Sequence, residues 1–118
     1  MSVVNVKVNY IRPKYNNLKE WMKDENNVYI GRRGIVFIEE RRFPEKDSIW
    51  ANPFKIGRDG SRDEVLNKYK IYITNKLKDK NMLNELLKLK NKNLGCWCKP
   101  DKCHGDILLD IIHNIDQN

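Results

Sequence analysis

The sequence predicts a single small α/β domain, residues 1–118, with a short and mainly parallel sheet flanked by helices. Its length of 118 residues is that of one domain. Short apolar runs near both ends have the length and composition of strands. The segments between them place apolar residues three and four positions apart, which is typical of helices that cover a sheet.

Strands are expected where apolar residues alternate or form short buried runs. Residues Val3 to Val8 alternate, Asn27 to Arg32 form a second strand that ends at Gly31, and Ile35 to Ile38 form another short strand. A buried strand then leads into Cys96 and Cys98. Between these segments, the densely charged 39–47 predicts a mobile excursion and 48–57 an ordered loop.

Helices are expected at four places. Leu18, Trp21 and Met22 are spaced for a short helix capped by Asn16 or Asn17. Ser61 and Glu64 fit a capping box for a longer helix that Asn81 ends. Residues 82–89 form the next helix, and the last one begins near Asp101.

Composition limits the classes of function. No apolar run spans a bilayer and no export signal is evident, so three cysteines predict free thiols in the cytoplasm. The formal charge of +7 keeps a nucleic-acid-binding module as an alternative. However, abundant Lys, Asn and Ile beside a single alanine, Ala51, indicate an AT-rich genome, so most lysines form a solvated surface.

The loop after the last strand carries the main chemical candidates. Cys96 is expected to be a buried apolar residue. Cys98 or Cys103 is the candidate nucleophile, because the dipole at a helix start lowers the pKa of a thiol. His104 is the candidate acid–base residue and Asp106 its orienting partner. Alternatively, His104 and Asp106 only cap or solvate the first turn of the helix.

Zinc is a second interpretation of the same loop. Three Cys and one His within nine residues match the ligands that zinc prefers. All four come from one segment, whereas structural zinc sites usually join two separated pairs. We therefore assign no metal ligand and no cofactor, and keep a zinc-stabilised structural module as an alternative.

Three further features predict a binding pocket for an anion. Arg32 follows the end of a strand, where ligands of open α/β sheets bind, and can clamp a phosphate; otherwise it is a surface arginine paired with Glu39 or Glu40. Gly105 lets a ligand approach the helix backbone, or else allows tight packing of helix on strand. The third group offers a ring for stacking and an amide for recognition, or else pins an ordered loop: Trp50, Asn52 and Phe54.

These motifs together resemble an uncharacterised family, a domain of unknown function found in short proteins of phages, large DNA viruses, bacteria and some microbial eukaryotes. The resemblance rests on Ile-Gly-Arg at 30–32, Trp-Ala-Asn-Pro-Phe at 50–54, and Gly-Cys-Trp-Cys at 95–98 followed by Cys-His-Gly-Asp at 103–106. It covers about residues 3–112. A second uncharacterised family has a similar loop with Arg in place of Gly105. The resemblance marks these residues as candidates and implies no established activity.

The leading hypothesis is a protein that binds a nucleotide or another phosphate-bearing small molecule between these three motifs. The ligand is either held or turned over, and turnover would make the protein a nucleotide-directed hydrolase or transferase with a Cys/His site. The hypothesis requires Arg32 to lie close to the Cys98–Asp106 loop. No membrane partner is expected, and the oligomeric state does not follow from the sequence.

Overall fold

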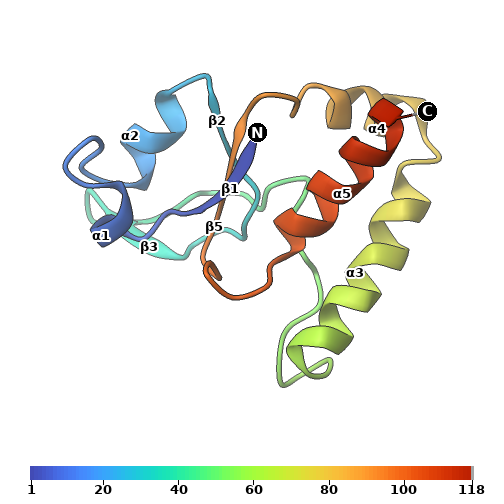
Figure 1. The fold of residues 1–118 in the computed structure, drawn as a ribbon. Helices are drawn as coiled ribbons and strands as arrows, with labels where there is room; N and C mark the ends of the chain where they lie inside the picture. Colours follow the sequence, from blue (N-terminus) through green and yellow to red (C-terminus); the bar gives the residue numbers. More distant parts are fainter. Residues whose placement is uncertain (118) are drawn as a thin grey trace.

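A three-stranded parallel sheet lies at the centre of the computed structural model, which describes residues 1–117; residue 118 of the predicted domain lies outside the described part. The strands are β1 (Ser2–Asn5), β2 (Asn27–Tyr29) and β5 (Asn93–Cys96). Their order is β1-β5-β2, and β5 pairs in parallel with both neighbours (Figure 1). The carboxyl ends of all three strands therefore meet at one edge of the sheet.

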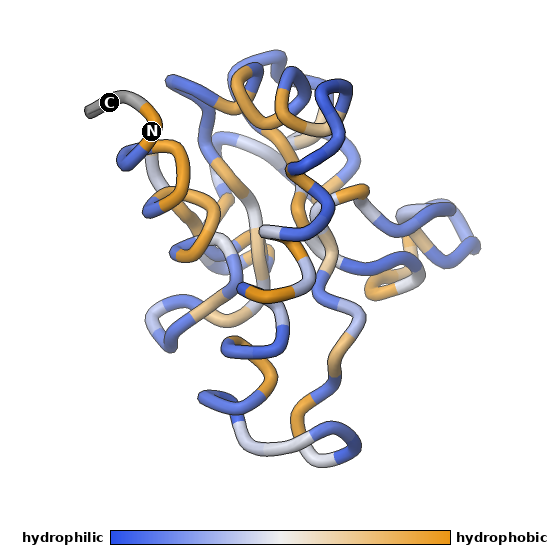
Figure 2. Tube along the Cα trace, turned by 90° about the vertical axis from the view of Figure 1, so that its right-hand side faces the viewer, coloured by the Kyte–Doolittle hydropathy of each residue, from blue (hydrophilic) through white to orange (hydrophobic). Residues whose placement is uncertain are grey.

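Helices cover the two faces of this sheet, which confirms the predicted α/β fold class (Figure 1). One face packs against α3 (Arg62–Lys76), α4 (Lys80–Leu87) and α5 (His104–Gln117), where Leu94 and Cys96 are buried. The other face packs against α1 (Val8–Ile11) and α2 (Leu18–Lys23), with Trp21 in its core. Figure 2 shows hydrophobic and hydrophilic residues alternating along the helices, as expected for segments with one buried side.

Two strands form a separate antiparallel hairpin: β3 (Val36–Ile38) and β4 (Arg41–Phe43). The prediction that residues 39–47 form a mobile excursion was therefore wrong for 39–43, which belong to this hairpin. Glu39 and Glu40 form the turn with φ values of 54° and 63°, the left-handed conformation that a two-residue hairpin turn requires. Neither residue is a usual choice for this conformation, so the turn carried no sequence signal.

Several element boundaries differ from those predicted. β1 ends at Asn5, whose side-chain oxygen accepts a hydrogen bond from the backbone N–H of Lys7 at 2.9 Å and turns the chain into α1. The break between α3 and α4 falls before Asn81, because Asp79 caps α4 through the N–H of Asn81. The last helix begins at His104 rather than near Asp101. The capping box at Ser61 and the cap at Asn17 are present as predicted.

No helix within residues 1–117 is both long and apolar enough to cross a membrane.

Candidate functional site

A cavity of about 580 Å³ opens at the carboxyl edge of the sheet. Each strand sends residues to its wall just after it ends: Lys7 follows β1, Arg32 follows β2, and Cys98 follows β5. The rest of the wall comes from the 52–56 segment, from Ile35, from the start of α3 and from the segment that leads into α5. Arg32 therefore lies at the same cavity as the Cys98–Asp106 loop, as the pocket hypothesis requires.

The side chain of Arg32 is held by the loop that carries the Trp-Ala-Asn-Pro-Phe motif at 50–54. Its Nε donates to the carbonyl oxygen of Asn52 at 3.0 Å, and its Nη2 donates to that of Phe54 at 2.8 Å. The side chain of Asn52 is buried and holds the same loop, since its Oδ1 accepts from the N–H of Phe54 at 2.9 Å. Two of the five guanidinium N–H donors are thus used within the described chain.

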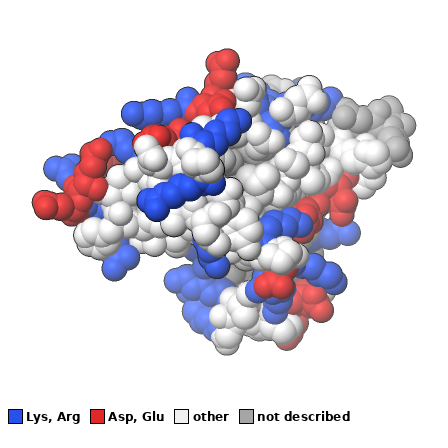
Figure 3. All heavy atoms as spheres, turned by 60° about the vertical axis from the view of Figure 1, so that its left-hand side comes forward, with Lys and Arg blue, Asp and Glu red and all other residues white. Residues whose placement is uncertain are grey.

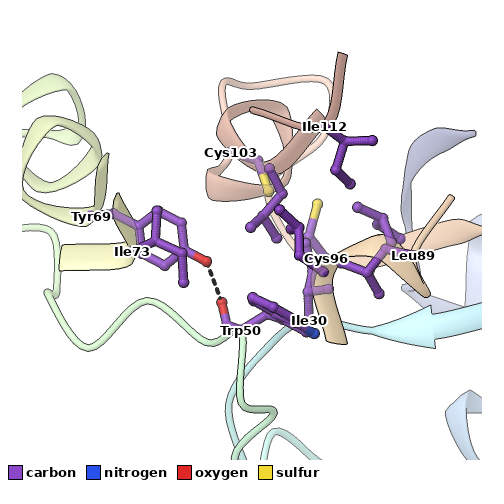
Figure 4. Packing of buried hydrophobic residues seen from close by; sticks show 11 residues of the cluster. Ile30, Trp50, Tyr69, Ile73, Leu89, Cys96, Cys103 and Ile112 are labelled. Carbon is purple, nitrogen blue, oxygen red and sulfur yellow. Dashed lines mark hydrogen bonds between the residues drawn. The ribbon is translucent and has the colours of Figure 1, made fainter. Parts of the chain in front are cut away.

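Trp50 lies in the core and not at the cavity. It is 3% exposed, and its carbonyl oxygen accepts a hydrogen bond from the hydroxyl of Tyr69 at 2.8 Å (Figure 4). Of the two interpretations of this motif, the pinned loop therefore holds for Trp50. Phe54 does line the cavity, and its ring meets Tyr72 edge-on at 6.0 Å between centroids.

Three free thiols gather at the inner end of the cavity. Cys96 and Cys103 are buried between the sheet and α5 (Figure 4), whereas Cys98 is half-buried. A hydrogen bond from Cys103, helped by the guanidinium of Arg62, lowers the pKa of Cys98 to about 6. The bond from Cys103 also lowers the pKa of Cys96, to about 7. Only Cys98 combines a lowered pKa with exposure to the cavity.

The pKa of Cys103 is shifted in the direction opposite to the one predicted from its position near a helix start. Its hydrogen bonds to Cys96 and Cys98, followed by its burial, raise its pKa above the ordinary value, so it stays a thiol. The helix start was expected to lower this pKa. Donating a proton to neighbouring sulfurs outweighs the dipole here, because a thiol that stabilises a thiolate must keep its own proton.

Arg62 is the functional residue that the sequence analysis did not single out for the site. It is the first residue of α3, and its Nη1 donates to the carbonyl oxygen of Lys102 at 2.9 Å. Its Nη2 lies 3.7 Å from a carboxylate oxygen of Asp101. The capping box predicted where this helix begins in the sequence. No local signal indicated that its first residue would lie beside Cys98 in the folded chain.

His104 is buried and held by the end of β2. Its Nε2 donates to the carbonyl oxygen of Ile30 at 2.6 Å, because a carbonyl can only accept. Its Nδ1, left without a proton, lies 3.8 Å from the sulfur of Cys103. Burial lowers the pKa of His104, so the ring is neutral at pH 7.

Asp106 does not orient His104, contrary to the prediction. Its Oδ1 accepts from the ammonium of Lys99 at 2.6 Å, and its Oδ2 accepts from the backbone N–H of Cys103 at 3.1 Å. The carboxylate therefore satisfies a backbone donor at the start of α5, which is the alternative interpretation of this residue. The orienting group of His104 is the carbonyl of Ile30.

Gly105 serves packing in this structure. A Cβ added there would lie 2.8 Å from a methyl carbon of Ile30 and 2.9 Å from one of Val3, so α5 can lie this close to the sheet only with glycine. Its N–H donates to the sulfur of Cys103 at 3.3 Å. The other interpretation of Gly105, a helix backbone open to a ligand, is not supported here, because the N–H donors of Cys103 and Gly105 are both used.

A search of residues 1–117 for metal sites finds no group of three or more His, Cys, Asp or Glu side chains positioned to hold an ion.

The fold and site define a small α/β protein with a ligand-sized cavity at the carboxyl ends of its parallel strands. The chain belongs to the family described as Domain of unknown function (DUF4326), whose model matches residues 14–114. This confirms the family resemblance predicted from the motifs.

Two relatives are themselves uncharacterised. Uncharacterized protein R718 of Acanthamoeba polyphaga mimivirus is 32% identical over 99 residues, covering 77% of this chain and 70% of the relative. The Uncharacterized 12.4 kDa protein in nrdA-td intergenic region of Enterobacteria phage T4 is 32% identical over 72 residues, covering 59% and 65%. No solved structure gives a significant match.

Proposed function

We propose that this protein binds a nucleotide or another phosphate-bearing small molecule in the cavity at the carboxyl edge of the sheet. One observation carries the proposal. Five basic side chains line the cavity, and no Asp or Glu of the described chain does: Lys7, Arg32, Lys55, Arg62 and Lys102. The whole sequence has 16 acidic residues beside 23 basic ones, so the lining is more basic than the chain as a whole. Arg62 and Lys102 have acidic neighbours outside the lining, Asp101 at 3.7 Å and Asp63 at 4.0 Å, whereas no salt bridge is found for Lys7, Arg32 or Lys55 within the described residues. Figure 3 shows Lys and Arg side chains on the lower lobe and at its junction with the rest of the molecule, with Asp and Glu side chains among them.

The apolar part of the wall suits the rest of such a ligand. Phe54 and Trp97 present aromatic surface, and Ile35 and Ile56 add aliphatic surface. A cavity of about 580 Å³ is within the usual size range for small-molecule sites, which combine apolar walls with a few polar groups. The phosphate would meet the guanidinium of Arg32, and a base would lie against the aromatic wall.

Cys98 is the residue through which this site would turn a ligand over. It is the exposed thiol of the cluster, and its lowered pKa makes it a thiolate at pH 7. His104 is turned toward Ile30 and Cys103, which makes it a positioning residue for the thiols. A hydrolase or transferase reaction would thus use Cys98 as nucleophile. Free thiols also favour a cytoplasmic place of action, in an infected cell where the protein is viral.

Titration calorimetry with inorganic phosphate and nucleoside 5′-monophosphates tests the binding proposal. The variant Arg32→Ala should weaken binding by roughly 1.5–3 kcal/mol, or about ten- to 150-fold, the usual contribution of a hydrogen bond to a charged group. Lys55→Gln should weaken binding without touching the bonds that hold the loop. Arg41→Ala, on β4 and away from the cavity wall, is the matched control and should change nothing.

Salt dependence separates this proposal from the alternative of a nucleic-acid-binding surface. Binding to a phosphate backbone weakens by about a thousandfold or more between about 50 and 200 mM salt when several phosphates are contacted. A ligand held in a cavity should lose far less. Failure of phosphate and of every mononucleotide to bind at millimolar concentration would refute the proposal.

A further inference from the structure

A second cavity, of about 670 Å³, adjoins the first. Lys7 and Trp97 line both cavities, so the two share a boundary at these residues. The second cavity lies over the other face of the sheet, between the start of α1, the start of α2 and strand β3. The two cavities together extend well beyond the space that one nucleotide needs.

The second cavity shares two features with the first, apolar walls and basic side chains. Its walls are apolar at Val8, Leu18 and Val36, and Arg12 joins Lys7 as a basic group. Glu39 also lines it, and its carboxylate lies 3.1 Å from the ammonium of Lys19, which is outside the lining. The cavity therefore offers positive charge beside apolar surface.

Phe37 is the feature of this cavity that the fold itself does not explain. Its side chain lines the cavity yet is 66% exposed on the hairpin, so it contributes little to the core. The guanidinium of Arg42 lies 5.2 Å from the centre of its ring. An exposed aromatic ring beside basic side chains is the arrangement on which bases stack in proteins that bind single-stranded nucleic acids.

We propose that the ligand is a dinucleotide unit, with one nucleoside in each cavity and the linking phosphate at Lys7. This inference rests on the proposed function, because it takes the first cavity as the site of a nucleotide. The second base would stack on Phe37. A free dinucleotide and the end of a single strand present this same chemistry.

Titration calorimetry with three probes tests the inference: thymidine 5′-monophosphate, the 5′-phosphorylated thymidine dinucleotide, and an oligothymidine of about ten nucleotides. The dinucleotide should bind about five- to 150-fold more tightly than the mononucleotide, the gain expected from stacking one base on an aromatic side chain. A further gain for the oligomer would identify a strand end as the source. Equal affinity for dinucleotide and oligomer would identify a free dinucleotide.

Variants of Phe37 separate the inference from the proposed function. Phe37→Ala should remove most of the dinucleotide gain and leave mononucleotide affinity within about twofold, while Phe37→Trp should keep the gain. Tyr10→Ala is the matched control, since Tyr10 is 58% exposed and lines neither cavity. If the mononucleotide binds and the dinucleotide binds no better, the inference is wrong and the proposed function stands. If neither binds, both are wrong.

Discussion

The thiol of Cys98 should react with iodoacetamide at a pH far below that at which an ordinary cysteine reacts. The hydrogen bond from Cys103, together with the guanidinium of Arg62, lowers the pKa of Cys98 from 9.0 to about 6. The thiolate is the form that reacts, so the rate follows its population. The rate should therefore reach half of its maximum near pH 6.

The size of the effect depends on two opposing factors. At pH 7 roughly nine-tenths of a thiol of pKa 6 is ionised, against about 1% for a pKa of 9, a gain of about 90-fold. A thiolate of lower pKa is less nucleophilic, by about 16- to 30-fold over this interval. The net advantage is therefore only about three- to sixfold at pH 7. At pH 6 the population gain is about 500-fold, so the net advantage rises to roughly 16- to 30-fold.

Alkylation followed by peptide mass spectrometry, over about pH 5 to 9, measures this profile for each cysteine. Cys96 and Cys103 are buried and should stay unlabelled in the native protein. The Arg62→Gln variant should shift the midpoint of Cys98 upward, because it removes the cation that faces the thiolate. A Cys98 rate that still rises between pH 8 and 9, or faster labelling of Cys96, would refute this account of the cluster.

Two further predictions concern stability, measured by urea unfolding. Gly105→Val should lower the free energy of unfolding by roughly 1–3 kcal/mol, because its side chain would overlap Ile30 and Val3; an unchanged midpoint would mean that α5 can move away from the sheet. Burial lowers the pKa of His104, so the unfolded chain binds this proton more readily and stability should fall as the pH drops below the unfolded value of 6.5. His104→Gln should lose less stability between about pH 7 and 5.5 than the unchanged protein, and an equal loss would contradict this origin.

Local signals in the sequence predicted the parts of the fold that local interactions determine. Ser61 and Glu64 form both bonds of a capping box within four residues, and the apolar run before Cys96 becomes the central strand. The hairpin turn at Glu39 and Glu40 could not be predicted, because cross-strand pairing imposes a conformation that these residues do not favour. The α/β fold class was predicted correctly, because it depends on the order of helices and strands rather than on their exact ends.

For the site as well, the sequence predicted some contacts correctly and missed those that depend on how distant elements pack. Arg32 and Cys98 were placed together correctly, because both follow strand ends and parallel strands end at one edge. The prediction that Asp106 pairs with His104 was wrong. It relied on their proximity in the sequence, whereas the carboxylate binds Lys99 and the N–H of Cys103. Arg62 was missed as a partner of Cys98 because the two residues meet only through the packing of α3 beside the last loop.

The thiols and His104 form one connected arrangement of side-chain contacts. The carbonyl of Ile30 holds the proton of His104 on Nε2, at 2.6 Å. Nδ1 then carries a lone pair and lies 3.8 Å from the sulfur of Cys103, so it can only accept from that thiol and donates no proton to it.

Cys103 keeps its proton and shares it with Cys98, whose charge also faces Arg62. The carbonyl of Ile30, just after β2, sets the tautomer of His104 beside a thiol on the loop after β5, although the two lie far apart in the chain. A thiolate kept this way needs no neighbouring histidine as its base. That is why a buried neutral His104 and an ionised Cys98 are consistent with each other in one site.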